Sequence, residues 1–142
     1  MSDIVQNCAG IIEIKNKMII VFYDGKCGLC SREIRHYINI APVDIFDWQD
    51  ITISRDCLKK YGISHSNALK LLHAIGENGK VHVGLKAFIL IWKHLRKWNF
   101  LAKIVSLPLL YNILEFAYRV FASWRFSRLE HCQLALRNEN NP

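Results

Sequence analysis

Cys27 and Cys30 are the residues of this chain whose type and spacing can do chemistry. The two residues between them allow one sulfur to reach the other and close a small disulfide ring. A thiolate, rather than a thiol, is the group that attacks a disulfide. A Cys-x-x-Cys pair in a chain without an evident secretion signal therefore predicts a redox-active dithiol.

The elements on either side of the pair place it at a junction between a strand and a helix. Met18–Tyr23 is a short run of β-branched and aromatic residues, which is typical of a buried strand. Leu29–Ile40 has apolar residues at helical spacing. A helix N-terminus presents free N–H groups and the positive end of the helix dipole, and both favour a thiolate. The neighbouring Lys26 and Arg32 further favour a thiolate on Cys27.

Asp24 lies between the strand and the cysteine pair, and two roles are open for it. A carboxylate at this place can relay a proton from the Cys30 thiol, which must lose that proton to attack a mixed disulfide. An Asp-Gly sequence is also typical of a turn, in which the carboxylate accepts backbone N–H groups and caps the start of the helix. The two roles are compatible, and the sequence favours the turn role more strongly.

A zinc site is the main alternative use of the pair, because two thiolates supply half of a tetrahedral site. The other half would have to come from five scattered residues: Cys57, Cys132, His65, His73 and His82. None of these forms a second close pair at the spacing of a zinc finger, so we expect no metal and no other cofactor. We interpret Cys57 as a small packing residue and regard Cys8 and Cys132 as incidental.

The whole chain has 142 residues, which suits one domain with a single core, and a formal net charge of +7. Its basic residues are dispersed and no nucleic-acid-binding motif occurs, so we expect a solvated basic surface and no nucleic-acid partner. An odd number of cysteines and no evident signal peptide favour a reducing, cytoplasmic setting.

The apolar patterns divide the chain into an N-terminal arm, a core and a C-terminal extension. Residues 1–17 form the arm, with a short edge strand at Ile11–Ile14, and residues 18–99 form the core. The further elements expected in the core are strand Val43–Trp48, helix Arg55–Tyr61, strands Lys70–Ile75 and Lys80–Val83, and helix Leu85–Trp98. The order βαβ, short helix, ββ and α is that of the thioredoxin fold.

Residues 100–137 are expected to be a helical extension packed on the core, followed by a frayed tail at 138–142. Charges recur along it at Lys103, Glu115 and Arg119, which is unfavourable for a membrane span. A stripe at helical spacing is predicted to face the core: Leu110, Ile113, Leu114, Ala117, Val120, Phe121 and Trp124. Contact with a membrane surface through exposed aromatic residues is the lesser alternative.

The residues around the dithiol resemble the opening motif of the DCC family, a group of small thioredoxin-like proteins: Tyr23, Asp24, Gly25, Cys27, Leu29 and Cys30. The similarity extends to later positions: Asp47-Trp48, Leu72–Ala74, Gly79–Gly84, Ala87-Phe88, Leu107-Pro108, Tyr118 and Arg125. Asp47 lies where the family has a second strand that ends in an Asp.

This resemblance implies an α/β, thioredoxin-like fold with a helical C-terminal extension, and activity as a thiol-disulfide oxidoreductase. It implies that Cys27 is the more exposed nucleophile and that Cys30, one turn into the helix, is the partly buried resolving cysteine. The substrate would be a disulfide-containing protein or a small thiol compound. Reducing electrons would come from another thiol system.

One departure from the thioredoxin pattern bears on the substrate. Thioredoxin-fold oxidoreductases usually have a cis-proline just before the third strand, where the backbone pairs with the substrate chain. Residues 67–71 contain no proline here, so either the substrate docks differently or protein disulfides are not the main substrate. The rival hypothesis is a non-catalytic binding or membrane-peripheral module, in which the cysteine pair is structural or binds metal.

Overall fold

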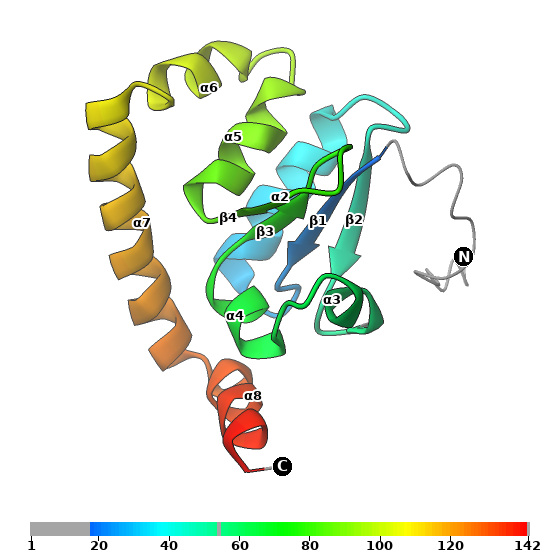
Figure 1. The fold of residues 1–142 in the computed structure, drawn as a ribbon, viewed down its shortest axis with the longest axis vertical. Coiled ribbons are helices and arrows are strands. Elements are labelled where there is room, and N and C mark those ends of the chain that lie inside the picture. Colours follow the sequence, from blue (N-terminus) through cyan, green and yellow to red (C-terminus); the bar gives the residue numbers. More distant parts are fainter. Residues whose placement is uncertain (1–17, 54, 142) are drawn as a thin grey trace.

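The computed structural model describes residues 18–53 and 55–141, and a four-stranded sheet lies at the centre of this part (Figure 1). The strands are β1 (Ile19–Tyr23), β2 (Phe46–Asp50), β3 (His73–Ile75) and β4 (Val81–Val83). Their order is β2-β1-β3-β4; β1 is parallel to β2 and antiparallel to β3, and β3 is antiparallel to β4. Together with its covering helices, this mixed sheet confirms the predicted α/β, thioredoxin-like fold.

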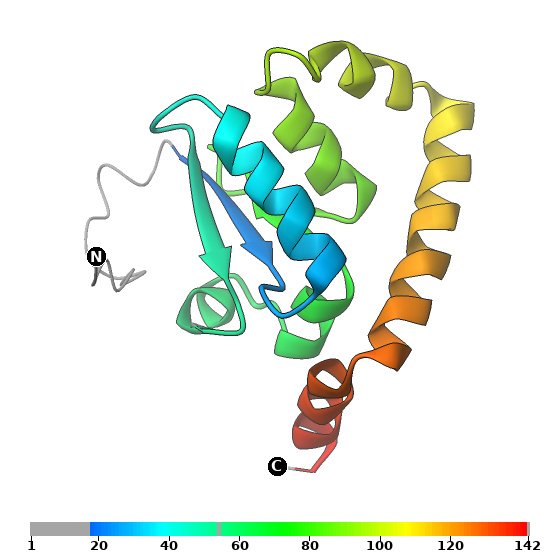
Figure 2. The ribbon, with the colours of Figure 1, turned by 180° about the vertical axis from the view of Figure 1, so that it is seen from behind.

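Helices cover both faces of the sheet. On one face lie α2 (Gly28–Ile40) and α5 (Leu85–Lys93), which are in front of the sheet in Figure 2. On the other face lie α3 (Asp56–Lys60), α4 (His65–Lys70) and α8 (Glu130–Asn140). The helices α6 (Asn99–Val105) and α7 (Pro108–Arg128) connect the two sets along one side of the molecule (Figures 1 and 2).

The strand β1 is apolar throughout because both of its faces are buried. Ile19 and Val21 pack against α2 and α5, whereas Ile20 and Phe22 pack against α3, α4 and α8. Alternate side chains of a strand point to opposite faces, so one five-residue run contributes to two cores. Because helices cover both faces of the sheet, the cysteine pair lies at an end of the sheet, just after the last residue of β1.

The segment before β3 differs from the prediction. A strand at Lys70–Ile75 is wrong for its first three residues, because His65–Lys70 forms α4. The Ser64 side chain accepts a hydrogen bond from the Asn67 N–H at 3.3 Å and so caps this helix. The strand that remains, β3, is only three residues long.

Other boundaries move by a few residues. The second strand lies at Phe46–Asp50 rather than Val43–Trp48, so the acidic residue at its end is Asp50 and not Asp47. The helix predicted to reach Trp98 ends at Lys93. The tail predicted to fray is helical as far as Asn140. The predicted arm (1–17), its strand Ile11–Ile14 and Cys8 lie outside the described residues.

The helix α7 buries a different face from the predicted one. Its first residue, Pro108, suits a helix start because proline lacks the N–H that would be unpaired there. The helix packs against α4, α5, α6 and α8. Its buried residues are Ala122, Arg125 and Phe126, while most of the predicted stripe is exposed rather than buried in the core: Ile113, Ala117, Val120, Phe121 and Trp124. Both sides of α7 are apolar, and spacing alone does not say which side meets the core.

Among the described residues, no helix taken singly has the length and the apolar character that a membrane crossing requires. The pair α6 and α7 meets that requirement when taken together, by length and composition, but the two helices are bent by 97° at their junction.

Substitution of Phe126 by Ala should test whether α7 contributes to the core. Phe126 is 8 % exposed and packs in the cluster that contains Ile20 and Phe22. We expect the free energy of unfolding in urea to fall by about 3–5 kcal/mol. The matched control is Phe116→Ala on the same helix, where the side chain is 72 % exposed, and the change should stay within about 0.5 kcal/mol. Equal effects of the two substitutions would contradict this packing.

Candidate active site

The junction of β1 and α2 holds the cysteine pair. The chain leaves β1 after Tyr23, turns at residues 24–26 and enters α2 at Gly28, with Cys27 as the N-cap residue. The Cys27 sulfur accepts a hydrogen bond from the Cys30 N–H at 3.3 Å, and so occupies the place that an N-cap oxygen normally takes. Negative charge on this sulfur would be stabilised by that N–H and by the helix dipole.

The exposure of the two cysteines is the reverse of the expectation. Cys27 is only 3 % exposed, and Cys30 is the more accessible of the two. Burial raises the pKa of the Cys30 thiol to about 12, and a side-chain hydrogen bond to Cys27 adds to the rise. The positive charge of Arg125 opposes it. Cys30 therefore keeps its proton at neutral pH and is suited to donate to Cys27.

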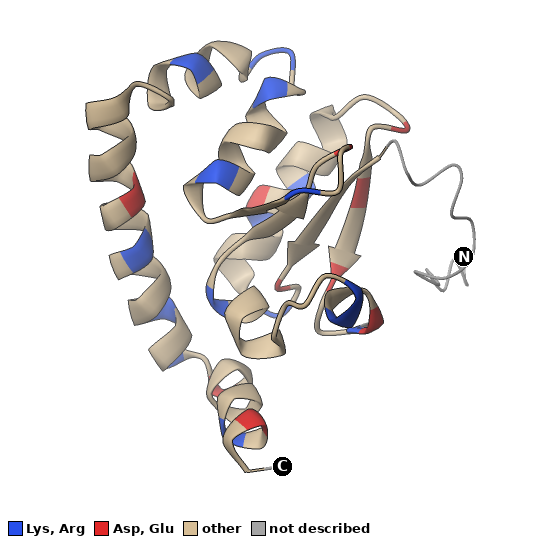
Figure 3. Cartoon of the chain, in the orientation of Figure 1, with Lys and Arg blue, Asp and Glu red and all other residues tan. Residues whose placement is uncertain are grey.

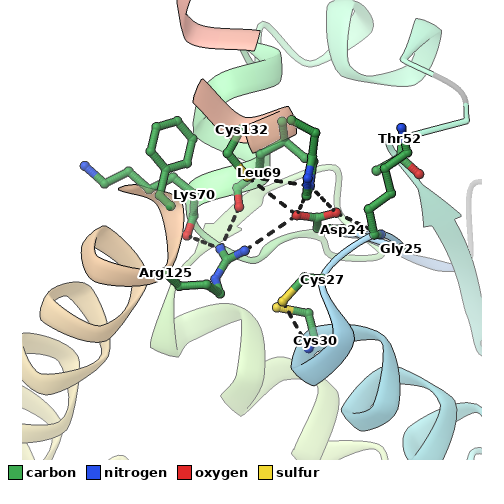
Figure 4. Close-up of polar contacts among 12 residues, drawn as sticks. Asp24, Gly25, Cys27, Cys30, Thr52, Leu69, Lys70, Arg125 and Cys132 are labelled. Carbon is green, nitrogen blue, oxygen red and sulfur yellow. Dashed lines mark hydrogen bonds and ion pairs between the residues drawn. The ribbon is translucent and has the colours of Figure 1, made fainter. Parts of the chain in front are cut away.

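Asp24 is buried, at 4 % exposure, and its carboxylate joins three parts of the chain (Figure 4). Its Oδ1 accepts the Lys26 N–H at 3.0 Å, which is the predicted turn role. Its two oxygens lie 3.0 and 2.8 Å from Nε2 of His131. The Sγ of Cys132 donates to Oδ2 at 3.7 Å. The carboxylate thus connects the end of β1 to the first turn of α8.

Arg125 brings a positive charge from α7 to the same place. Its Nη1 lies 3.6 Å from Oδ2 of Asp24, and its Nη2 donates to the carbonyl oxygens of Leu69 and Lys70 at 2.6 and 2.9 Å (Figure 4). The residue is 8 % exposed. The guanidinium is planar, so these two hydrogen bonds from Nη2 fix its orientation. Its charge acts on the Cys30 thiol, whose pKa it lowers against the larger effect of burial.

Three of these residues were not expected to take part in the site. Local spacing predicts no chemistry for Arg125 or His131, and the sequence indicates only an incidental Cys132. Cys132 is fully buried, and burial together with the nearby Asp24 charge raises its pKa to about 12. The presence of Arg125 among the residues that resemble the DCC family was the one available signal. Nothing in local spacing links residues 125–132 to Asp24, a hundred positions earlier.

A group that can bind a metal also forms here, although not the group considered from the sequence. The ligand atoms of Asp24, His131 and Cys132 all lie within 4.8 Å of one another. The Arg125 guanidinium beside the same carboxylate repels a divalent cation. Of the residues considered as the second half of a zinc site, Cys132 lies next to Asp24. Cys57 is buried in the core on the other side of β1 from α2 and is disulfide-bonded, so it is more than the predicted packing residue.

Gly25 is required by the close approach of β2. A Cβ at this position would lie 1.8 Å from an oxygen of Asp50. The same carboxylate accepts the Gly25 N–H at 3.2 Å and the Thr52 N–H at 2.9 Å. Asp50 therefore fixes the turn that leads into Cys27, which gives the Asp-Gly sequence a structural reason.

A cavity of about 390 Å³ lies beside the pair, between α2, α5 and α7. Its lining is mostly apolar and includes Leu29, Phe88, Trp92 and Phe121. Cys30 forms part of its wall, and Asp24 and Arg125 also line it. A thiol and an ion pair thus border an otherwise apolar space.

In a comparison with protein families, residues 21–130 match the DCC1-like thiol-disulfide oxidoreductase family. The match covers the dithiol, the sheet except the first two residues of β1, and the whole of α7, and this chain belongs to that family. Membership supports a role as a thiol-disulfide oxidoreductase. Comparison with curated proteins and with solved structures gave no match.

Replacement of Arg125 by Met should show its effect on the thiols. Because the guanidinium lowers the pKa of Cys30, its loss should move the pH profile of iodoacetamide alkylation to higher pH. A shift of one pH unit makes the rate at a fixed pH below the pKa about tenfold lower.

Two further variants separate charge from structure in this measurement. Arg125→Lys keeps the charge but not the fork, and should recover part of the rate. The control, Arg128→Met, removes an exposed arginine from the same helix and should leave the profile unchanged. An unchanged profile in Arg125→Met would show that the guanidinium does not act on the thiols.

Proposed function

We propose that this protein catalyses thiol–disulfide exchange through Cys27 and Cys30. The observation that carries the proposal is the N-cap position of the Cys27 sulfur, which accepts the Cys30 N–H at 3.3 Å. A sulfur at this place is stabilised as a thiolate, and a thiolate is the form that attacks disulfides. Family membership supports the same class of reaction.

Cys27 acts as the nucleophile in this proposal, and Cys30 resolves the mixed disulfide. The Cys27 thiolate attacks one sulfur of the substrate, the substrate S–S bond breaks, and the leaving thiolate takes a proton. Cys30 then loses its proton and attacks the Cys27 sulfur, which releases the second substrate thiol. The pair loses two electrons and two protons, and the substrate disulfide becomes two thiols. Another dithiol compound restores the reduced pair.

Asp24 and His131 offer a route for the proton that Cys30 must lose. The carboxylate is buried, and the side chain of His131, bonded to it at 2.8 Å, is 22 % exposed. A proton accepted near the pair can therefore pass through the carboxylate to an imidazole that meets water. In this role Asp24 serves both the turn and the reaction.

A reducing compartment such as the cytoplasm would keep the pair ready to reduce a disulfide. The proposed reaction begins with Cys27 and Cys30 as thiols. The electron donor would be a second thiol system.

Mild oxidation of the reduced protein should join Cys27 to Cys30 within one molecule. Mass spectrometry of the digest should find the two residues in one linked peptide, and a Cys132→Ser variant should behave in the same way. A link from Cys27 to Cys132, or a stoichiometric zinc ion that resists dialysis, would count against the proposal.

Trapping should assign the roles of the two sulfurs. After reaction with an aromatic disulfide reagent, Cys30→Ser should accumulate a stable mixed disulfide on Cys27, because the resolving thiol is missing. Cys27→Ser should react at least about tenfold more slowly, since the pKa of Cys30 near 12 leaves little thiolate at neutral pH. If Cys27→Ser reacted faster than Cys30→Ser, Cys30 would be the nucleophile and Cys27 the resolving cysteine.

A further inference from the structure

We infer that the substrate of the dithiol is a small apolar disulfide that enters the cavity beside Cys30, and not an extended polypeptide. This inference rests on the proposed function and adds the substrate class to it. Two independent features carry it: the backbone beside the dithiol is already hydrogen-bonded within the chain, and the space that leads to Cys30 is small and apolar.

The backbone that precedes β3 has no free groups at the positions where a substrate strand would pair. The Leu72 N–H donates to the Tyr118 hydroxyl at 3.0 Å, and the Leu72 carbonyl accepts the Gly84 N–H at 2.8 Å. The Leu71 carbonyl lies 2.8 Å from Nδ1 of His73, and the Leu71 N–H completes the last turn of α4. An extended peptide binds by adding main-chain hydrogen bonds, so it has nothing to pair with here.

The helix α7 is the element that occupies these positions. The Tyr118 hydroxyl accepts the Leu72 N–H. Arg125, two turns further along the helix, donates to the carbonyl oxygens of Leu69 and Lys70. Both residues also line the cavity. The extension thus bonds to the backbone that a bound polypeptide would pair with, and forms one wall of a cavity that is partly open to solvent.

The cavity has the size and the lining for a small apolar compound. Its volume of about 390 Å³ is at the lower end of the range for small-molecule sites, roughly 300–1,000 Å³. Cys27 is 3 % exposed, which leaves a protein disulfide little access to its sulfur. Cys30 lines the cavity, and its N–H lies 3.3 Å from that sulfur. A compound in the cavity therefore contacts Cys30 and lies next to the turn that holds the Cys27 sulfur.

Two small disulfides of nearly equal size test the inference. Di-n-propyl disulfide and bis(2-hydroxyethyl) disulfide differ by a methyl in place of a hydroxyl at each end. With dithiothreitol as reductant, we expect kcat/KM for the propyl compound to be about tenfold higher or more. Ala117→Phe, which fills the cavity from α7, should remove most of this preference, and the control Ser123→Phe on the same helix should keep it.

The outcomes separate the substrate class from the reaction. Equal rates for the two compounds, or faster reduction of a protein disulfide such as that of insulin, would overturn the apolar-substrate inference and leave the exchange reaction standing. Failure of every disulfide to oxidise Cys27 and Cys30 would overturn both. A preference that Ala117→Phe leaves intact would place the substrate outside this cavity and contradict the inference.

A second, independent feature is the outer face of α6 and α7. Along α7, Leu109, Ile113, Phe116, Val120 and Trp124 follow one another at helical spacing and are 54–76 % exposed. Phe100 and Ile104 of α6, and Leu107 between the two helices, are also exposed, at 46–63 %. So many exposed large apolar side chains on neighbouring helices are unusual for a surface that meets only water.

The charged residues of α5, α6, α7 and their connections are almost all positive. Between Leu85 and Arg128 the chain has eight Lys or Arg residues and one acidic residue, Glu115. Of the 19 basic and 12 acidic residues in the chain, this leaves eleven of each elsewhere, so the net charge of +7 belongs to α5–α7 and their connections. Figure 3 shows basic residues along all three helices.

We propose that the outer face of α6 and α7 docks on an anionic lipid bilayer, in the interfacial plane. An apolar stripe flanked by basic residues is the pattern of a helix that lies in that plane. Arg119 and Arg128 flank the stripe. The guanidinium of Arg128 lies 5.6 Å from the Trp124 ring centre, whereas that of Arg119 is paired with Glu115 at 2.7 Å. Charge complementarity selects lipid headgroups over a second copy of this chain, since two copies would bring the same positive face together.

Vesicle flotation tests this docking with the full chain. We expect binding to mixed phosphatidylcholine–phosphatidylglycerol vesicles, several-fold weaker binding to phosphatidylcholine alone, and loss of binding as salt is raised. The double variant Phe116→Gln/Trp124→Gln should bind at least about tenfold less. The control, Val43→Gln/Ile53→Gln, changes two apolar side chains of 85 % and 84 % exposure elsewhere and should bind like the wild type.

The other results would overturn the docking proposal. Equal binding to the two vesicle types would show that charge does not drive the docking, and absence of binding would show that this face does not dock on a membrane. A dimer detected by light scattering, and abolished by Phe116→Gln/Trp124→Gln, would assign the face to a second copy.

Discussion

The buried carboxylate of Asp24 is the interaction on which the rest of the structure depends. A charge at 4 % exposure requires partners, and this one has the Lys26 N–H, the guanidinium of Arg125 and the imidazole of His131. Loss of one partner of a buried charge commonly costs several kcal/mol, so the carboxylate makes α7 and α8 part of the domain. The same contacts place the Arg125 cation where it acts on the Cys30 thiol, and bind an imidazole to the carboxylate, so one group serves both the fold and the site.

The C-terminal extension changes what a thioredoxin-like sheet can do. In the described residues, α7 supplies the partners of the backbone before β3 through Tyr118 and Arg125, and α8 closes the site with His131 and Cys132. The missing proline at this position then has a physical explanation, because the backbone is bonded to the extension. The opposite face of α7 remains apolar and exposed, which accounts for the hydrophobic character of a segment that contributes only part of its surface to the core.

The local elements and the fold class were predictable from the sequence. The strand β1, the helix after it, the hairpin strands and the start of α7 at Pro108 each have a signal in a few neighbouring residues. The two short helices around residues 56–70 were harder. Ser64 caps α4, but the residues that follow it are equally compatible with a strand, and only the packing of Ala68 and Leu69 against β1 and α8 selects the helix.

Sequence alone determined the dithiol, its position at a helix N-terminus and the thioredoxin-like order of elements, because these depend on spacing within about a dozen residues. Tertiary structure decided which face of α7 is buried, which cysteine is more accessible and which distant side chains complete the site. Arg125, His131 and Cys132 reach Asp24 only because α7 and α8 pack back across the end of β1. Contacts over a hundred residues leave no periodic trace in a chain, since they are fixed by the fit of whole elements against one another.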